Sequence, residues 1–186
     1  IGNAYQINRS YKLAKDCFEE VLTHNPNNPD YLFNYGNALL SLNQFDKSID
    51  AYQNSIKNNS LKPDADTFNN LGNAYRHLGK NEDAIGCYKQ ALEINPKSIY
   101  SKVELIHLMQ HVCEWENINT LFDDIKNHIT NGDKGKISPF TVLSMPNLNN
   151  KDHLSVATNW SEQIKIKSLN KISTPVKNKI TIGYLS

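Results

Sequence analysis

The sequence predicts an all-α fold in which antiparallel helix pairs stack into a solenoid, a superhelix of about three and a half pairs. The first observation is a Gly-Asn-Ala motif that recurs after 34 and then 36 residues, at Gly2, Gly36 and Gly72. The second is that a small residue and an aromatic residue follow each glycine at constant offsets. Such periods are typical of repeat proteins, in which each unit buries its apolar face only against its neighbours.

The residues at these offsets indicate how the two helices of a pair pack. The small residues are Ala14, Ser48 and Ala84, and the aromatic residues four positions later are Phe18, Tyr52 and Tyr88. Glycine and the small residue allow two antiparallel helices to approach closely, and the aromatic ring fills the space beside them. We therefore interpret these as packing residues: Gly36, Gly72, Ala84, Tyr75 and Tyr88.

Proline marks where the second helix of a pair should end. Pro26 and Pro96 close the first and third repeats, because proline lacks an N–H and clashes with the preceding turn of a helix. In the second repeat Pro63 lies three residues beyond the matching position. A two-residue insertion in the loop at 57–63 accounts for this displacement.

A fourth, degenerate pair is predicted from Ser98 to about Thr130. Ile106 replaces the glycine, and residues 112–115 form the link between the two helices. An apolar face at helical spacing still marks the second helix, with Ile118, Leu121, Phe122, Ile125 and Ile129. The predicted order is half a repeat, three helix pairs and a C-terminal transition region.

Asparagines recur on the side of the first helices that faces away from the packing residues. We expect them to form a row along the concave groove: Asn3, Asn34, Asn37, Asn70 and Asn73. An asparagine amide has one acceptor oxygen and two donor hydrogens, so it can pair with the backbone of an extended peptide. Asparagine is also a poor helix former, so its repetition within helices requires a reason. A general richness in asparagine, also visible at 25–28 and 147–150, is the alternative explanation.

Charge and cysteine content exclude several classes of function. The formal net charge is +1, which favours neither a nucleic-acid nor a membrane partner. Apolar runs are shorter than the roughly 18 residues that span a bilayer. The three cysteines, Cys17, Cys87 and Cys113, form no disulfide framework, so reduced thiols in a cytoplasmic protein are expected.

Candidate catalytic and metal sites are weak. His107 and His111 stand four positions apart on one helix but lack an obvious third ligand, so no metal is expected. The lysines between Lys165 and Lys179 form a local basic stretch, which we interpret as a solvated face. No catalytic group and no cofactor can be assigned in this fragment.

The repeat signature resembles the tetratricopeptide repeat (TPR) family over roughly residues 1–130. Ile1 stands first in place of a methionine, and the apolar residues at the other end have nothing after them to pair with. We therefore expect a piece of a longer protein. Its expected divisions are a TPR solenoid at 1–130, a helical linker at 131–176 and a β-strand that opens another domain at 177–186.

Further motifs resemble O-GlcNAc transferases and their SPINDLY relatives. The stretch at 107–115 is similar to the last repeat before the catalytic region, and 137–146 is similar to the linker of the bacterial members. Ala157 and Trp160 match an A-x-x-W helix, and 179–186 resembles the first strand of the GT-B catalytic domain.

The resemblance implies that the parent is a glycosyltransferase whose catalytic residues lie beyond this chain. Its donor would be a nucleotide sugar, with UDP-GlcNAc expected and GDP-fucose an alternative. The TPR groove would then recruit acceptor polypeptides. Two other functions remain open: a stand-alone adaptor for protein–protein interaction, and a surface for homo-oligomerisation, since exposed solenoid ends commonly stack.

Overall fold

The computed structural model describes residues 10–59, 64–132 and 137–163. These ranges are helical, and no strand occurs in them, so the predicted strand at 177–186 lies outside the described residues. The helices are α2 (Tyr11–His24), α3 (Pro29–Ser41), α4 (Phe45–Asn58), α5 (Ala65–His77), α6 (Asn81–Ile94), α7 (Ile99–His111), α8 (Ile118–Thr130), α9 (Pro139–Val142) and α10 (Asn150–Gln163). None of these helices is long and apolar enough to cross a bilayer.

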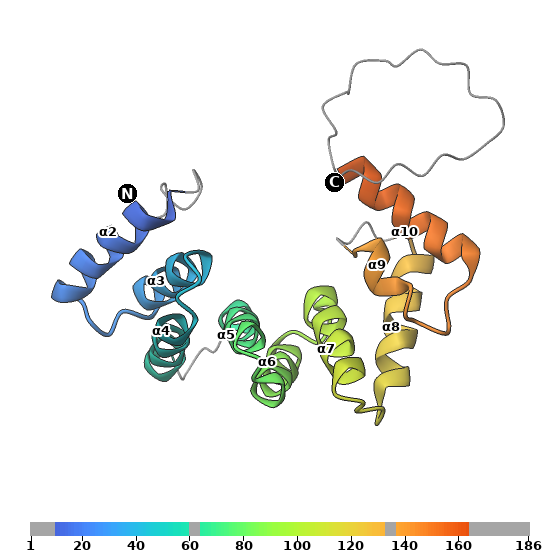
Figure 1. The fold of residues 1–186 in the computed structure, drawn as a ribbon, viewed down its shortest axis with the longest axis horizontal. Coiled ribbons are helices and arrows are strands. Elements are labelled where there is room, and N and C mark those ends of the chain that lie inside the picture. The colour runs from blue at the N-terminus through green and yellow to red at the C-terminus, as the bar shows by residue number, and fades with distance from the viewer. Residues whose placement is uncertain (1–9, 60–63, 133–136, 164–186) are drawn as a thin grey trace, which may run out of the picture.

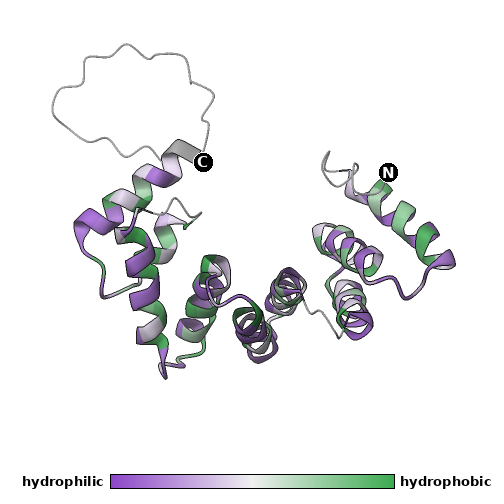
Figure 2. Cartoon of the chain, turned by 180° about the vertical axis from the view of Figure 1, so that it is seen from behind, coloured by the Kyte–Doolittle hydropathy of each residue, from purple (hydrophilic) through white to green (hydrophobic). Residues whose placement is uncertain are grey.

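The helices form an arc, with α2 at one end and α10 at the other (Figure 1). Helices α3, α5 and α7 lie along the inner edge, and α4 and α6 lie along the outer edge (Figure 1). Consecutive helices pack on one another from α2 to α8. Hydrophobic and hydrophilic residues alternate along the helices, as amphipathic packing requires (Figure 2). The predicted solenoid of stacked pairs is confirmed.

The packing interpretation of the repeat motif is also confirmed. A Cβ atom placed on Gly36 would lie 2.6 Å from Cε1 of Tyr52, and one on Gly72 would lie 3.0 Å from Cε1 of Tyr88. Both tyrosines and Ala84 are fully buried. The glycine therefore provides the space that the ring of the second helix occupies.

The inner helices begin with side-chain caps. Asn28 Oδ1 accepts a hydrogen bond from the Tyr31 N–H, and Ser98 Oγ accepts one from the Ser101 N–H. Asp64 caps α5 in the same way, through the Asp66 N–H. Each of these residues precedes an inner helix and satisfies one donor of its first turn. The outer helices α4 and α6 have no such cap.

The turn within each pair has the same backbone conformation in all three described pairs. Asn43, Gly79 and Cys113 have positive φ angles of 58°, 72° and 58°. The N–H of the next residue returns to the carbonyl five positions earlier: Gln44 to Leu39, Lys80 to Tyr75 and Glu114 to Met109. This pattern is the Schellman end of a helix, which favours glycine or asparagine at the left-handed position.

Cys113 is the poorest of the three residues for this conformation, since a Cβ atom makes the left-handed region unfavourable. We expect Cys113→Gly to raise the free energy of unfolding by about 0.5–1 kcal/mol, once the greater freedom of glycine in the unfolded chain is subtracted. Urea denaturation would measure it. The control is Cys113→Ala, which removes the thiol but keeps Cβ. An equal gain in both variants would contradict the backbone explanation.

The last pair differs from the others. Ile106 is fully buried at the position of the earlier glycines, and α7 packs less extensively on α8 than α5 does on α6. Helix α8 contacts α10 in addition to α7. One core cluster joins the end of the solenoid to the segment behind it and includes Ile106, Phe122, Val142, Met145 and Val156. The apolar face predicted for the second helix is confirmed, with all but Leu121 of its residues buried.

Helix α10 covers the segment predicted around Ala157 and Trp160. It begins with reciprocal bonds: Asn149 Oδ1 accepts from the Asp152 N–H at 3.1 Å, and Asp152 Oδ2 accepts from the Asn149 N–H at 3.0 Å. This capping box fixes where the helix starts. The division expected near residue 130 stays a prediction, because α9 and α10 share a core with the last pair.

Candidate functional site

Four of the five predicted asparagines lie on the inner helices of the arc. Asn34 and Asn37 belong to α3, and Asn70 and Asn73 belong to α5. All four are partly buried. Asn3 lies outside the described residues. The predicted row therefore has members on two neighbouring inner helices.

Asn37 is the centre of a hydrogen-bond network that links two repeats. Its Oδ1 accepts from the Tyr52 hydroxyl at 2.8 Å and from Nδ2 of Asn70 at 2.9 Å. Tyr52 belongs to the outer helix of the same pair, while Asn70 comes from the next inner helix. The two donors fix the orientation of the amide, since only its oxygen can accept both bonds. Asn34 instead donates from Nδ2 to the backbone carbonyl of Asp30 at 2.8 Å.

Asn73 has the same arrangement in the next pair, except that its second hydrogen-bond donor is a tyrosine hydroxyl instead of an asparagine amide. Its Oδ1 accepts from the Tyr88 hydroxyl at 2.7 Å and from the Tyr100 hydroxyl at 2.9 Å. The residue equivalent to Asn70 is Glu104, whose carboxylate has no hydrogen to donate. Glu104 lies 3.8 Å from Nε of Arg76 instead, and Tyr100, one turn earlier on α7, supplies the donor.

The amide nitrogens of Asn37 and Asn73 remain available. Neither nitrogen donates a hydrogen bond to another residue in the part of the chain that the structure describes. Because both amide oxygens are held by buried tyrosines, these N–H groups have a fixed direction before any ligand arrives. Such preorganised donors can pair with carbonyl groups of an extended backbone.

Burial raises the pKa of the Tyr52 and Tyr88 hydroxyls. The folded chain therefore holds these protons at pH values where the unfolded chain, with an ordinary tyrosine pKa near 10, has lost them. The contribution of each tyrosine to the free energy of unfolding is therefore fully present below about pH 10, and it decreases as the pH rises above that value.

We expect the free energy of unfolding to fall above about pH 10 by roughly 1.4 kcal/mol per pH unit for each such tyrosine. Urea denaturation at a series of pH values from about 9 to 11 would measure this slope. In Tyr88→Phe the slope should be shallower, while Asn73 Oδ1 keeps its bond from Tyr100. Equal slopes in the two proteins would rule out Tyr88 as a source of the alkaline loss.

Sequence reasoning missed the tyrosine partners and Asn69. Asn69 is buried, and its Oδ1 accepts from the Ser101 hydroxyl at 2.8 Å, so it joins α5 to α7 inside the stack. The pairing of Asn37 with Tyr52 and of Asn73 with Tyr88 has a signal in the sequence, because both pairs are separated by 15 residues. Phe18, at the corresponding place in the first repeat, has no hydroxyl.

The two histidines noted in the sequence lie side by side on α7, with ring centroids 6.0 Å apart. Within residues 10–59, 64–132 and 137–163, no three His, Cys, Asp or Glu side chains gather closely enough to hold a metal ion. Cys87 is buried, and burial raises the pKa of its thiol to about 12, so it should be unreactive at neutral pH.

The arc of paired helices and its polar inner face define a helical-repeat protein. Models described as tetratricopeptide repeat match residues 1–28, 17–50 and 65–98, so tetratricopeptide repeats are recognised in these segments. The predicted TPR resemblance is confirmed in these segments.

Relatives and solved structures agree with this assignment. Small glutamine-rich tetratricopeptide repeat-containing protein 2 of Mycosarcoma maydis is 26% identical over 98 residues, which are 52% of this chain and 27% of that protein. Anaphase-promoting complex subunit 6 of Arabidopsis thaliana is 29% identical over 105 residues, 53% of this chain and 19% of that protein. The chain thus spans about a quarter or less of the length of these relatives.

Two solved structures illustrate the fold. The first TPR of Spaghetti (RPAP3) bound to the HSP90 peptide SRMEEVD is 25% identical, with a TM-score of 0.57, over 60% of this chain and 87% of that one. A crystal structure of MamA is 14% identical, with a TM-score of 0.63, over 87% of this chain and 91% of that one. The second likeness concerns the fold alone.

Proposed function

We propose that the inner face of α3, α5 and α7 binds an extended polypeptide segment. The observation that carries this proposal is the fixed direction of the Asn37 and Asn73 amides, whose oxygens accept from buried tyrosines while their nitrogens are left for a ligand. Donors directed at backbone carbonyls give affinity without requiring one particular side-chain sequence. The function is therefore that of a protein-interaction module.

A bound peptide in the structure of the first TPR of Spaghetti supports a peptide ligand in general. That peptide, SRMEEVD, is rich in acidic residues. In this chain Arg76, in the last turn of α5, already lies beside Glu104, with 3.8 Å between Arg76 Nε and a Glu104 carboxylate oxygen. An acidic segment would have to compete with this carboxylate, so we expect the ligand of this groove to be of a different composition.

The finer proposal is that the segment is an acceptor for a parent O-glycosyltransferase of the O-GlcNAc transferase or SPINDLY type. Its support is the order of the motifs at 107–115, 137–146 and 179–186. The parent would use a nucleotide sugar, UDP-GlcNAc or GDP-fucose, and act in the cytoplasm. None of the relatives described above is named as a glycosyltransferase, so a stand-alone adaptor is the second candidate. Transfer of labelled sugar by the full-length parent would separate the two.

Asparagine-to-aspartate changes test the groove without disturbing the fold. In Asn37→Asp and Asn73→Asp the acceptor oxygens for the tyrosine hydroxyls remain, but the amide donors are lost. Alanine would remove both and leave the hydroxyls of Tyr52 and Tyr88 short of an acceptor. We expect the double variant to bind peptides selected on the native chain about tenfold or more weakly, since each lost hydrogen bond contributes about 1 kcal/mol.

The control is Asn54→Asp, which adds one negative charge, as each groove change does, on the outer helix α4, where the side chain is exposed. Fluorescence anisotropy with the selected peptides would measure the affinities, and circular dichroism would verify the fold. Unchanged affinity in a folded double variant would eliminate the asparagine row as a binding element.

A further inference from the structure

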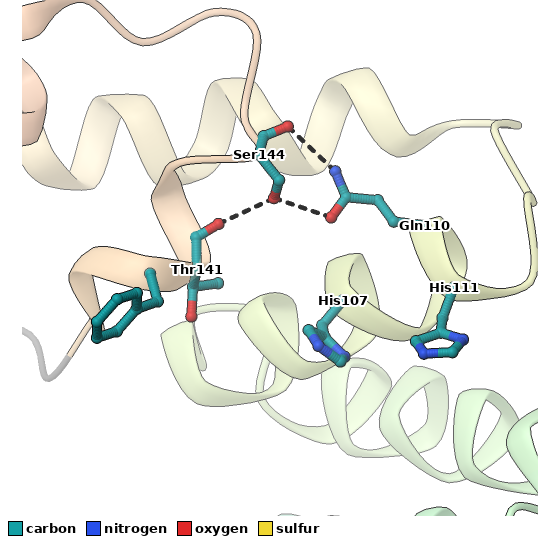
Figure 3. Close-up of a pocket in the computed structure, with 6 residues that line it drawn as sticks. His107, Gln110, His111, Thr141 and Ser144 are labelled. Atoms are coloured by element: carbon teal, nitrogen blue, oxygen red, sulfur yellow. Dashed lines mark hydrogen bonds between the residues drawn. The ribbon is translucent and has the colours of Figure 1, made fainter. Parts of the chain in front are cut away.

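A pocket of about 500 Å3 lies between α7 and α9 (Figure 3). Its lining comes from one face of α7 and from the segment that starts at Phe140. The lining residues are His107, Gln110, His111, Phe140, Thr141 and Ser144. The volume is within the range of about 300–1,000 Å3 that is usual for ligand sites.

Two hydrogen bonds hold the two walls of this pocket together. Gln110 Nε2 donates to the backbone carbonyl of Ser144 at 3.2 Å, and the Ser144 hydroxyl donates to Gln110 Oε1 at 3.0 Å (Figure 3). Val142 and Met145, both buried, fasten the same segment to the core. The side chains of Gln110 and Ser144 are thus engaged in structural hydrogen bonds. The residues left to contact a ligand are His107, His111, Phe140 and Thr141.

The remaining groups favour a flat, aromatic ligand. Phe140 is 82% exposed, although it belongs to a segment fixed by its neighbours. The imidazole rings of His107 and His111 lie 6.0 Å apart with planes tilted by 44°. Aromatic rings attract one another in offset or edge-to-face arrangements at such separations. Among the described residues, no carboxylate, lysine or arginine lines the pocket, so these residues supply no permanent charge with which to select an ion.

Thr141 adds a polar group to this aromatic site. Its hydroxyl makes no hydrogen bond to another residue in the described ranges, and it faces the same opening as His107 (Figure 3). A hydroxyl next to Phe140, in a pocket whose other wall carries imidazole rings, fits a phenol, which has an apolar body and a polar tip. Among protein side chains that description fits tyrosine.

The pocket also continues the row of groove residues. His107 lies 34 residues after Asn73, at the repeat position that Asn37 and Asn73 occupy in the preceding pairs. A segment that runs along the inner face past these asparagines would therefore reach the pocket at the end of the solenoid.

We propose that this pocket is an anchor site for a tyrosine side chain of the bound polypeptide, which packs on Phe140 and bonds to the hydroxyl of Thr141, with His107 on the facing wall. This inference rests on the proposed binding of an extended segment to the groove. It adds a side-chain preference to a surface that otherwise recognises backbone.

The test uses four fluorescent peptides of about twelve residues, composed of Ser, Thr and Ala and differing only at one central position: Tyr, Leu, Asp or Lys. The full chain should bind the tyrosine peptide about tenfold more tightly than the Asp and Lys peptides, the size expected for one buried aromatic anchor. Phe140→Ala should abolish this preference, and it should fold normally because the side chain is exposed. Leu154→Ala, at an exposed residue of α10 outside the pocket lining, should keep the preference.

The outcomes distinguish the inference from the proposed function. Equal affinity for all four peptides would overturn the anchor site, and the groove would then recognise only the peptide backbone. Tighter binding of the Asp or Lys peptide would overturn it as well. No binding of any peptide would overturn both proposals. A tyrosine preference that survives Phe140→Ala and is also kept in His107→Ala would place the anchor elsewhere and reject this pocket.

Discussion

Ile106→Ala is expected to lower the free energy of unfolding by about 2–5 kcal/mol, the largest effect of any single change considered for this chain. Ile106 is fully buried and belongs to the cluster that joins α7 and α8 to α9 and α10. Removing its side chain leaves a cavity that the surrounding residues can fill only in part. Urea denaturation, followed by circular dichroism, would measure the loss.

The control for this prediction is Ile94→Ala. It deletes the same atoms from a residue that is 38% exposed near the end of α6, so the cost should be below about 1 kcal/mol. Losses of similar size at the two positions would mean that Ile106 is not an essential part of the core. The shape of the urea curve also tests whether α9 and α10 unfold together with the last pair, because segments that share one core should unfold in a single transition.

Gly36→Ala is expected to destabilise the chain by about 1–3 kcal/mol, although alanine is the better helix former. The new Cβ would lie 2.6–2.9 Å from three ring atoms of Tyr52. That ring is fully buried, and its hydroxyl is bonded to Asn37, so it cannot move aside without breaking this bond. The steric cost therefore exceeds the gain of about 1 kcal/mol in helix propensity.

Gly86→Ala is the matched control, with an effect of opposite sign. Gly86 lies in the middle of α6, and a Cβ there would meet no other atom within 4 Å. Its replacement should stabilise the chain by up to about 1 kcal/mol through helix propensity alone. Gly72→Ala, with contacts of 3.0–3.3 Å, should fall between the two. Stabilisation by both Gly36→Ala and Gly86→Ala would refute close approach as the reason for the glycine motif.

These two predictions concern one repeat position with opposite requirements. At Gly36 and Gly72 the two helices of a pair are so close that a methyl group is excluded. At Ile106 the pair is more open, and the core would be incomplete without a large side chain. The difference arises because α8 is shared between α7 and α10, whereas α4 and α6 pack between neighbouring inner helices.

The sequence by itself determined the fold class, the packing motif and the three pairs that the described residues contain, α3–α4, α5–α6 and α7–α8. Its period placed Gly36 and Gly72 opposite Tyr52 and Tyr88, because a constant offset along two helices implies a constant contact between them. Pro26 and Pro96 located the ends of α2 and α6. Helical periodicity, which is a local property of the chain, predicted that Asn70 and Asn73 lie on the side of α5 opposite its packing residues.

Tertiary structure decided how the groove side chains are used. Asn37 and Asn73 appear equivalent in the sequence, yet one accepts its second bond from Asn70 and the other from Tyr100. Asn69, one residue before Asn70, is buried against Ser101, 32 residues away. Such choices depend on which side chains of neighbouring repeats come within about 3 Å of one another. Helical periodicity gives the direction of a side chain but not its partner, because the partner is fixed by how one repeat is rotated against the next.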